Sequence, residues 1–232
     1  DISPLPNYSG FSFLIVGPSG SGKTTALYSL LSKRKIKGKR VSYRKLFDKI
    51  YIISPTMGKS SIKNDPFKDI NKDQVFRKLT IEVLEKLENT LKENREEGLN
   101  STIILDDVGS EIKASAQVLK KLTAMIQNRR HDFASYFILL QKWRDAPTGI
   151  RNNISNLIIF KPKNEVEKES ISNELFPFKK NKFQQLFNYI FENDNKFSFM
   201  YVDMSLKQTN KFIFHNGFNK LDLYDEETHT AN

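Results

Sequence analysis

The stretch Gly17-Pro18-Ser19-Gly20-Ser21-Gly22-Lys23-Thr24-Thr25 decides the fold of this chain. It matches the phosphate-loop pattern G-x-x-x-x-G-K-[ST] at every fixed position. The apolar run 11–16 before it predicts a buried strand, and the residues after it predict a helix over about 23–33. These flanking elements argue against the alternative, a glycine-rich turn that fits the pattern by chance.

Glycines in such a loop let backbone N–H groups approach phosphate oxygens closely, and the helix N-terminus adds partial positive charge. The sequence therefore predicts a nucleoside triphosphate site built from 17–25. Lys23 is expected to contact the β- and γ-phosphates, and the Thr24 hydroxyl is expected to bind Mg²⁺.

A second informative stretch is 101–107, where an apolar run ends in Asp106 and Asp107. The carboxyl ends of parallel strands face the ligand in open sheets. Asp106 is therefore a candidate partner of the Mg²⁺ on the nucleotide, and Asp107 a candidate for orienting and deprotonating an attacking water. The alternative is a strand end whose two acids cap the next helix. The phosphate loop in the same chain favours the catalytic interpretation.

The remaining pattern alternates strands and helices, which predicts an α/β fold with a mainly parallel sheet. Helices are expected within about 73–97, with leucines on one face, over about 111–127, with Val118, Leu122, Met125 and Ile126 buried, and around 183–191. A surface loop is expected over 57–72. Further strands are expected at 50–53, 136–140, 157–160, 197–202 and 211–214.

Polar side chains near the ends of these elements are further candidates for the site. Gln141 follows the strand at 136–140, where it could contact the γ-phosphate or the attacking water. Arg129, Arg130 and Arg151 are candidates for an arginine finger, which stabilises transition-state charge from a neighbouring subunit. Each arginine could instead bind DNA or a surface carboxylate, and Gln141 could be an ordinary strand-end residue.

Composition limits the classes of partner. The chain has 232 residues, no cysteine and a formal net charge of +10. Such an excess favours a polyanion, first nucleic acid and second an anionic membrane, although a solvated lysine-rich surface gives the same charge. Eight of the 13 residues from Lys33 to Lys45 are basic, and they could contact DNA or only solvent.

Domain organisation and cellular location follow from what the sequence lacks. No run reaches the length of a membrane-spanning helix and no signal-peptide pattern opens the chain, so we expect a soluble, intracellular protein. No linker or repeat divides the sequence. We therefore expect one domain over 1–224 and a flexible tail over 225–232.

The ordered set of motifs resembles one family. It is similar to the poxvirus-type genome-packaging ATPases of large double-stranded DNA viruses, within the FtsK–HerA superfamily, over about residues 11–160. This likeness implies a single P-loop domain of the additional-strand, RecA-like class. The matching stretches are 17–25, Ile53-Ser54-Pro55-Thr56, Ile104-Leu105-Asp106-Asp107, Asn128-Arg129-Arg130-His131, the strand ending in Gln141, and Pro147-x-x-Ile150-Arg151-x-Asn153.

The resemblance also implies an activity and partners. It implies a Mg²⁺-dependent ATPase that forms a homo-oligomeric ring, a hexamer or pentamer, and pulls double-stranded DNA into a preformed capsid. Nucleotide would lie between subunits, with an arginine supplied in trans. Capsid or portal-vertex proteins would be its partners. It would be located in the host cytoplasm at the virus assembly site, and also in the virion. Many members carry Asp-Glu where this chain has Asp106-Asp107.

Two other functions use the same loop. A small-molecule or nucleoside kinase would need a second substrate pocket, and its activity would ignore DNA. A nucleotide-binding switch or assembly factor would bind ATP with negligible turnover. The adjacent pair Asp106 and Asp107 argues mildly against the kinase, and the intact set of Lys23, Thr24 and both aspartates argues against the switch.

Overall fold

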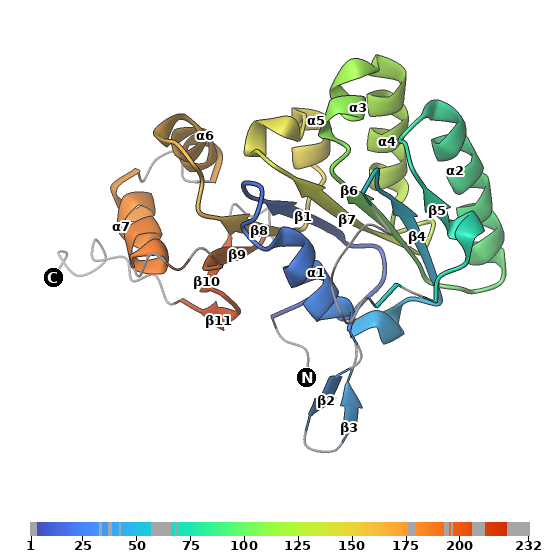
Figure 1. Cartoon of the computed structure of the whole chain (residues 1–232), viewed down its shortest axis with the longest axis horizontal. Coiled ribbons are helices and arrows are strands. Elements are labelled where there is room, and N and C mark those ends of the chain that lie inside the picture. The colour runs from blue at the N-terminus through green and yellow to red at the C-terminus, as the bar shows by residue number, and fades with distance from the viewer. Residues whose placement is uncertain are drawn as a thin grey trace, which may run out of the picture.

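The computed structural model describes residues 4–32, 34–36, 39–41, 43–56, 66–67, 69–175, 180–192, 195, 197–205 and 212–221. Side chains at 34–36, 39–41 and 180 are not part of this description. A nine-stranded sheet crosses the molecule in the order β11-β10-β9-β8-β1-β7-β6-β4-β5 (Figure 1). In that order its strands are Asn219–Lys220, Ile213–Asn216, Phe199–Asp203, Asn156–Phe160, Ser12–Val16, Ala134–Leu140, Ser101–Asp106, Lys49–Ile53 and Val75–Phe76.

The six strands from β8 to β5 are parallel, and β9, β10 and β11 extend the sheet antiparallel. Every residue of β1, β7 and β8 is buried, as expected for strands covered on both faces. Strand β7 lies between β1, which precedes the phosphate loop, and β6, which ends in Asp106. This inserted strand confirms the predicted additional-strand α/β fold.

Helices cover both faces of the sheet. Phe13 and Ile15 of β1 pack toward α1 (Lys23–Leu31) and η1 (Tyr43–Leu46), whereas Leu14 and Val16 pack into the core on the other face. This alternation is the period of a strand. The elements that supply that other core are α2 (Ile81–Glu96), α3 (Gly109–Ala114), α4 (Ala116–Asn128), η3 (Trp143–Asp145), α5 (Thr148–Arg151), α6 (Glu165–Leu175) and α7 (Lys180–Phe191).

Two predicted helices differ from those observed. The helix expected over 111–127 is two helices, α3 and α4, because the Ser115 hydroxyl accepts a hydrogen bond from Val118 N and begins a new helix. Its predicted buried face is confirmed. The predicted start of a helix at residue 73 is wrong, because η2 (Lys72–Gln74) and strand β5 occupy that position. Helix α2 begins only after Thr80, whose hydroxyl caps it.

Smaller corrections concern boundaries. Helix α1 ends at Leu31, β7 begins at Ala134, and the two late strands are shifted to Phe199–Asp203 and Ile213–Asn216. The two-residue strand β11 was not predicted. The tail over 225–232 and most of the loop at 57–72 lie outside the described residues.

Part of the basic run at 33–45 forms a separate hairpin. Strands β2 (Arg34–Ile36) and β3 (Lys39–Val41) pair antiparallel in a two-stranded sheet, and Figure 1 shows this hairpin projecting from the main body. It follows the C-terminal end of α1, so it lies at the end of that helix away from the phosphate loop. Across the described ranges, no helix combines the length and apolar character needed to cross a bilayer.

Candidate functional site

A cavity of about 290 Å³ opens where the carboxyl ends of the parallel strands meet the N-terminus of α1. The phosphate loop, the ends of β6 and β7, and the segment after β4 contribute to it. Its walls are Ser19, Gly20, Gly22, Lys23, Thr24, Thr25, Thr56, Asp106, Asp107, Leu139, Gln141 and Phe197. The structure therefore brings together Lys23, Thr24, both aspartates and Gln141, as the sequence predicted, and leaves the three candidate arginines outside.

The phosphate loop needs its glycines for two physical reasons. Gly20 and Gly22 have φ of +78° and +102°, in the left-handed region that side chains disfavour. Gly17 packs directly against β8, since a Cβ there would lie 2.6 Å from Phe160 Cβ and 2.7 Å from Ser21 Oγ. Close packing at Gly17 thus fixes where the loop leaves the sheet.

Lys23 is the first residue of α1 and folds back over the loop. Its Nζ donates to the carbonyl oxygens of Gly17 at 2.6 Å and Pro18 at 3.0 Å. Burial lowers the pKa of Lys23, and the negative charges of Asp106 and Asp107 oppose that shift. The ammonium group therefore lies within the field of the acidic pair, where a phosphate chain would compete for it.

Asp106 ends β6 and lies beside the end of β4. Its Oδ2 accepts a long hydrogen bond of 3.5 Å from the Ser54 hydroxyl, which is itself 3.2 Å from the Thr56 hydroxyl. Burial raises the pKa of Asp106, Asp107 raises it further, and Lys23 and Ser54 oppose the rise. The charged form of a half-buried carboxylate next to another carboxylate is stabilised by a bound cation.

The donors at this position fit Mg²⁺. Thr24 and Asp106 offer two oxygen ligands, and Mg²⁺ is usually held by one or two protein oxygens together with substrate phosphates and water. In the described parts of the chain, no group of three or more His, Asp or Glu side chains could hold a metal ion without such help.

Asp107 has an unusual backbone conformation. Its φ is +58°, which is uncommon for a residue other than glycine but is adopted more often by Asp and Asn. Its N–H donates to Leu139 O at 3.3 Å, and its Oδ1 accepts from Gln141 Nε2 at 3.0 Å. The ends of β6 and β7 are thus tied together, and the carboxylate is held at the cavity.

Arg129 and Arg130 lie near the amino-terminal ends of the parallel strands, at the end of the sheet opposite the cavity. They precede β7 at its amino end, where Ala134 N donates to Arg129 O at 2.9 Å. The seven residues of β7 separate them from Gln141 by roughly 20 Å. Arg129 donates to Ile126 O at 2.8 Å, and burial lowers its pKa. Neither arginine can reach the cavity of its own chain.

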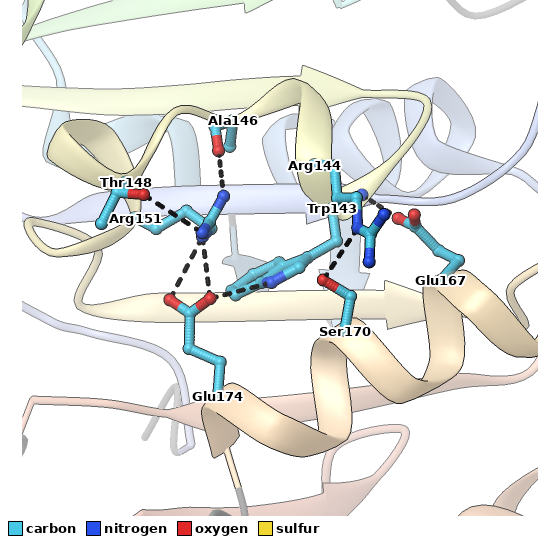
Figure 2. A network of polar contacts seen from close by, with 8 residues as sticks. All are labelled: Trp143, Arg144, Ala146, Thr148, Arg151, Glu167, Ser170 and Glu174. Carbon is cyan, nitrogen blue, oxygen red and sulfur yellow. Dashed lines mark hydrogen bonds and ion pairs between the residues drawn. The ribbon is translucent and has the colours of Figure 1, made fainter.

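Arg151 ends helix α5 and contacts residues of its own chain (Figure 2). Its Nε lies 3.1 and 2.9 Å from the two carboxylate oxygens of Glu174, and its guanidinium group lies 5.2 Å from the ring centroid of Trp143. It also donates to Ala146 O at 2.5 Å. These contacts place it outside the cavity walls.

Sequence reasoning missed several residues of the site. Ser54 and Thr56 belong to the motif Ile53-Ser54-Pro55-Thr56, but no function was predicted for them. Their position as polar residues directly after a buried strand was the pattern that could have indicated the site. Phe197 was interpreted as strand, yet it precedes β9, is 54% exposed and would lie 3.1 Å from a Cβ at Gly22. No pattern linked it to the phosphate loop.

Residues 7–206 match the family described as "Poxvirus A32 protein". The chain belongs to this family. This match confirms the resemblance drawn from the motifs. The A32-family chain is also similar to "Uncharacterized protein 075L" of Invertebrate iridescent virus 6, with 23% identity over 210 residues that cover 89% of this chain and 75% of that protein.

Solved structures share the fold of this A32-family chain. One is B204, the DNA-packaging ATPase from Sulfolobus Turreted Icosahedral Virus, with 16% identity, a TM-score of 0.60, and coverage of 89% of this chain and 97% of that chain. Another is the genome packaging NTPase B204 from Sulfolobus turreted icosahedral virus 2 in complex with AMP, with 15% identity, a TM-score of 0.58, and coverage of 91% and 98%.

Proposed function

We propose that this chain hydrolyses ATP with Mg²⁺ and uses the free energy to move double-stranded DNA into a viral capsid. The observation that carries the proposal is the convergence of Lys23, Thr24, Asp106, Asp107 and Gln141 on one cavity at the carboxyl edge of the sheet. The similar folds of the two B204 proteins, named as packaging enzymes and in one case solved with AMP, support a nucleotide in that cavity.

Binding follows from the loop. Backbone N–H groups of 17–25 and the N-terminus of α1 surround the phosphates, and Lys23 moves from its carbonyl partners to the β- and γ-phosphates. Thr24 and Asp106 hold Mg²⁺, which neutralises developing phosphate charge when bound. Burial and the charge of Asp107 disfavour the ionised form of Asp106. A bound cation would lower the free energy of that ionised form.

Hydrolysis uses the other two side chains. Asp107 orients a water for in-line attack on the γ-phosphorus and accepts its proton as the new O–P bond forms. The bond from the γ-phosphorus to the β–γ bridging oxygen breaks, so ADP and inorganic phosphate are the products. The Gln141 amide donates to Asp107 Oδ1 and would turn to contact the γ-phosphate when ATP is bound.

A complete site requires a second subunit. Arg129 and Arg130 lie about 20 Å from the cavity along β7, so either one acts as a finger only on the nucleotide of a neighbour. A homo-oligomeric ring, a hexamer or pentamer, supplies that geometry. The net charge of +10 then favours binding to DNA phosphates, and such binding does not depend on the base sequence. Capsid or portal-vertex proteins at the assembly site would receive the DNA.

Displacement of a third strand from duplex DNA tests this proposal. A triplex-forming oligonucleotide is bound at one end of a linear duplex, and ATP with Mg²⁺ is added to the full chain. We expect release of the oligonucleotide in proportion to ATP hydrolysed, and none with Lys23→Ala, which loses the phosphate contact. ATP hydrolysis without release would contradict translocation, and release by Lys23→Ala would contradict the assigned site.

A further inference from the structure

The segment directly after Gln141 is held chiefly by one helix. Strand β7 ends at Leu140, and the chain continues through Gln141 into η3 and then α5. Trp143, two residues beyond Gln141, is fully buried. Because so few bonds separate them, the placement of Trp143 restricts where the Gln141 amide lies, and that amide donates to the Asp107 carboxylate at 3.0 Å.

The helix that holds this segment is α6 (Figure 2). Its residues Glu167, Ser170 and Glu174 are spaced three and four apart, so they share one face. The Glu167 carboxylate accepts from Trp143 N, and the Ser170 hydroxyl accepts from Arg144 Nε at 3.2 Å. One face of α6 therefore bonds to the backbone and side chains of η3.

Glu174 makes the central contacts. Its Oε2 accepts from Trp143 Nε1 at 3.1 Å and from Arg151 Nε at 2.9 Å, and its Oε1 lies 3.1 Å from the same Arg151 nitrogen. The Arg151 guanidinium group lies over the Trp143 ring and also donates to Ala146 O. Its side chain is 15% exposed and that of Glu174 is 31% exposed, so solvent screens the pair only partly.

A second contact connects the same segment to α3, the helix that follows strand β6. Asp145 of η3 forms an ion pair of 2.5 Å with Lys113 of α3, the helix that follows Asp106 and Asp107. Residues 141–151 are thus linked to Asp107, to α3 and to α6. Helix α6 in turn packs against α7, where Lys168 Nζ lies 4.7 Å from the Phe187 ring centroid.

We propose that Glu174, through Trp143 and Arg151, is a positioning residue that sets Gln141 against Asp107 and relays the γ-phosphate state of the site to α6. The inference rests on the proposed ATP hydrolysis. When Gln141 turns from Asp107 to the γ-phosphate, Trp143 shifts with it and the Glu174 contacts carry that shift to α6. Arg151 then acts within its own subunit, not as a finger in trans.

The single tryptophan of the chain is a reporter of this relay. We expect Trp143 emission to differ between the AMPPCP and ADP complexes of the full chain with Mg²⁺. Glu174→Gln should abolish that difference and lower kcat about tenfold or more, with the KM for ATP within about twofold, because misplaced catalytic groups lose rate more than binding. The matched control Glu169→Gln, on an exposed position of the same helix, should behave as wild type.

Folding is checked separately. Buried Ile171 and Leu175 still anchor α6 in Glu174→Gln, so its thermal midpoint should stay near that of wild type. Arg151→Lys is the second variant, since it keeps the charge but loses the planar fork, and it should give an intermediate loss of kcat. A loss of kcat that only follows unfolding would assign Glu174 to stability and overturn the proposal.

The outcomes separate this inference from the proposed function. If wild type hydrolyses ATP while Glu174→Gln keeps its kcat and its nucleotide-dependent emission, the positioning role is wrong and the ATPase stands. If wild type hydrolyses no ATP, the proposed function is wrong and this inference is overturned with it.

Discussion

Asp107→Asn isolates the chemical role of one carboxylate. Asparagine adopts the left-handed conformation at φ +58° about as readily as aspartate. Its Oδ1 can still accept the hydrogen bond that Gln141 Nε2 donates to Asp107 Oδ1 at 3.0 Å. The substitution therefore keeps the backbone and the link between β6 and β7, and removes only a charge and a base.

The expected loss of rate follows from that role. A general base contributes about 10²–10⁴-fold, so kcat should fall by that factor, or about 3–5 kcal/mol of transition-state stabilisation. The KM for ATP should change little, because Lys23 and the loop remain. A second effect has a defined sign. Asp107 helps to raise the pKa of Asp106, so the variant should retain Mg²⁺-dependent nucleotide binding to lower pH than wild type.

Two assays measure these effects. Phosphate release against ATP concentration gives kcat and KM, and binding of a fluorescent nucleotide across pH, with and without Mg²⁺, gives the ionisation of Asp106. Asp73→Asn, at an exposed position beside β5, is the matched control and should match wild type in both. Hydrolysis by Asp107→Asn within about threefold of wild type would refute water activation by Asp107.

Two further experiments test the loop and the trans arginine. Gly17→Ala places a Cβ 2.6 Å from Phe160 Cβ of β8. It should therefore lower the free energy of unfolding, measured by calorimetry, by about 1–3 kcal/mol and weaken nucleotide binding. The control Gly149→Ala, whose added Cβ has no contact closer than 3.4 Å, should change neither the free energy of unfolding nor nucleotide binding. Asp107→Asn and the double variant Arg129→Ala/Arg130→Ala should each turn over ATP far more slowly than wild type when assayed alone. Turnover should rise when the two are mixed, because finger and base come from different subunits. No recovery on mixing would place the role of these arginines within one chain.

The phosphate loop and the acidic pair could be predicted because each depends on local sequence or on one general rule. Glycine positions fix the loop, and the carboxyl-edge rule for parallel strands places Asp106 and Asp107 beside it. The additional strand followed from the resemblance. It is confirmed by β7, which lies between β1 and β6.

Other features depend on contacts that no local pattern encodes. The left-handed φ of Asp107 and its bond to Gln141 require the register of β6 on β7. Glu174 meets Trp143 across 31 residues of sequence, in a helix whose polar face reads as solvent-exposed. The end of one helix at Ser115 was missed because a serine within an apolar pattern was not interpreted as a cap.

The proposed function is that of an ATP motor that acts on duplex DNA with sites shared between subunits. Its most direct test is steady-state ATP turnover with and without linear duplex DNA, across a series of salt and protein concentrations. We predict turnover that rises with DNA, loses that stimulation as salt increases, and increases more than proportionally with protein concentration. Turnover that does not change with DNA and is strictly proportional to protein concentration would show that the chain is not a DNA motor with shared sites.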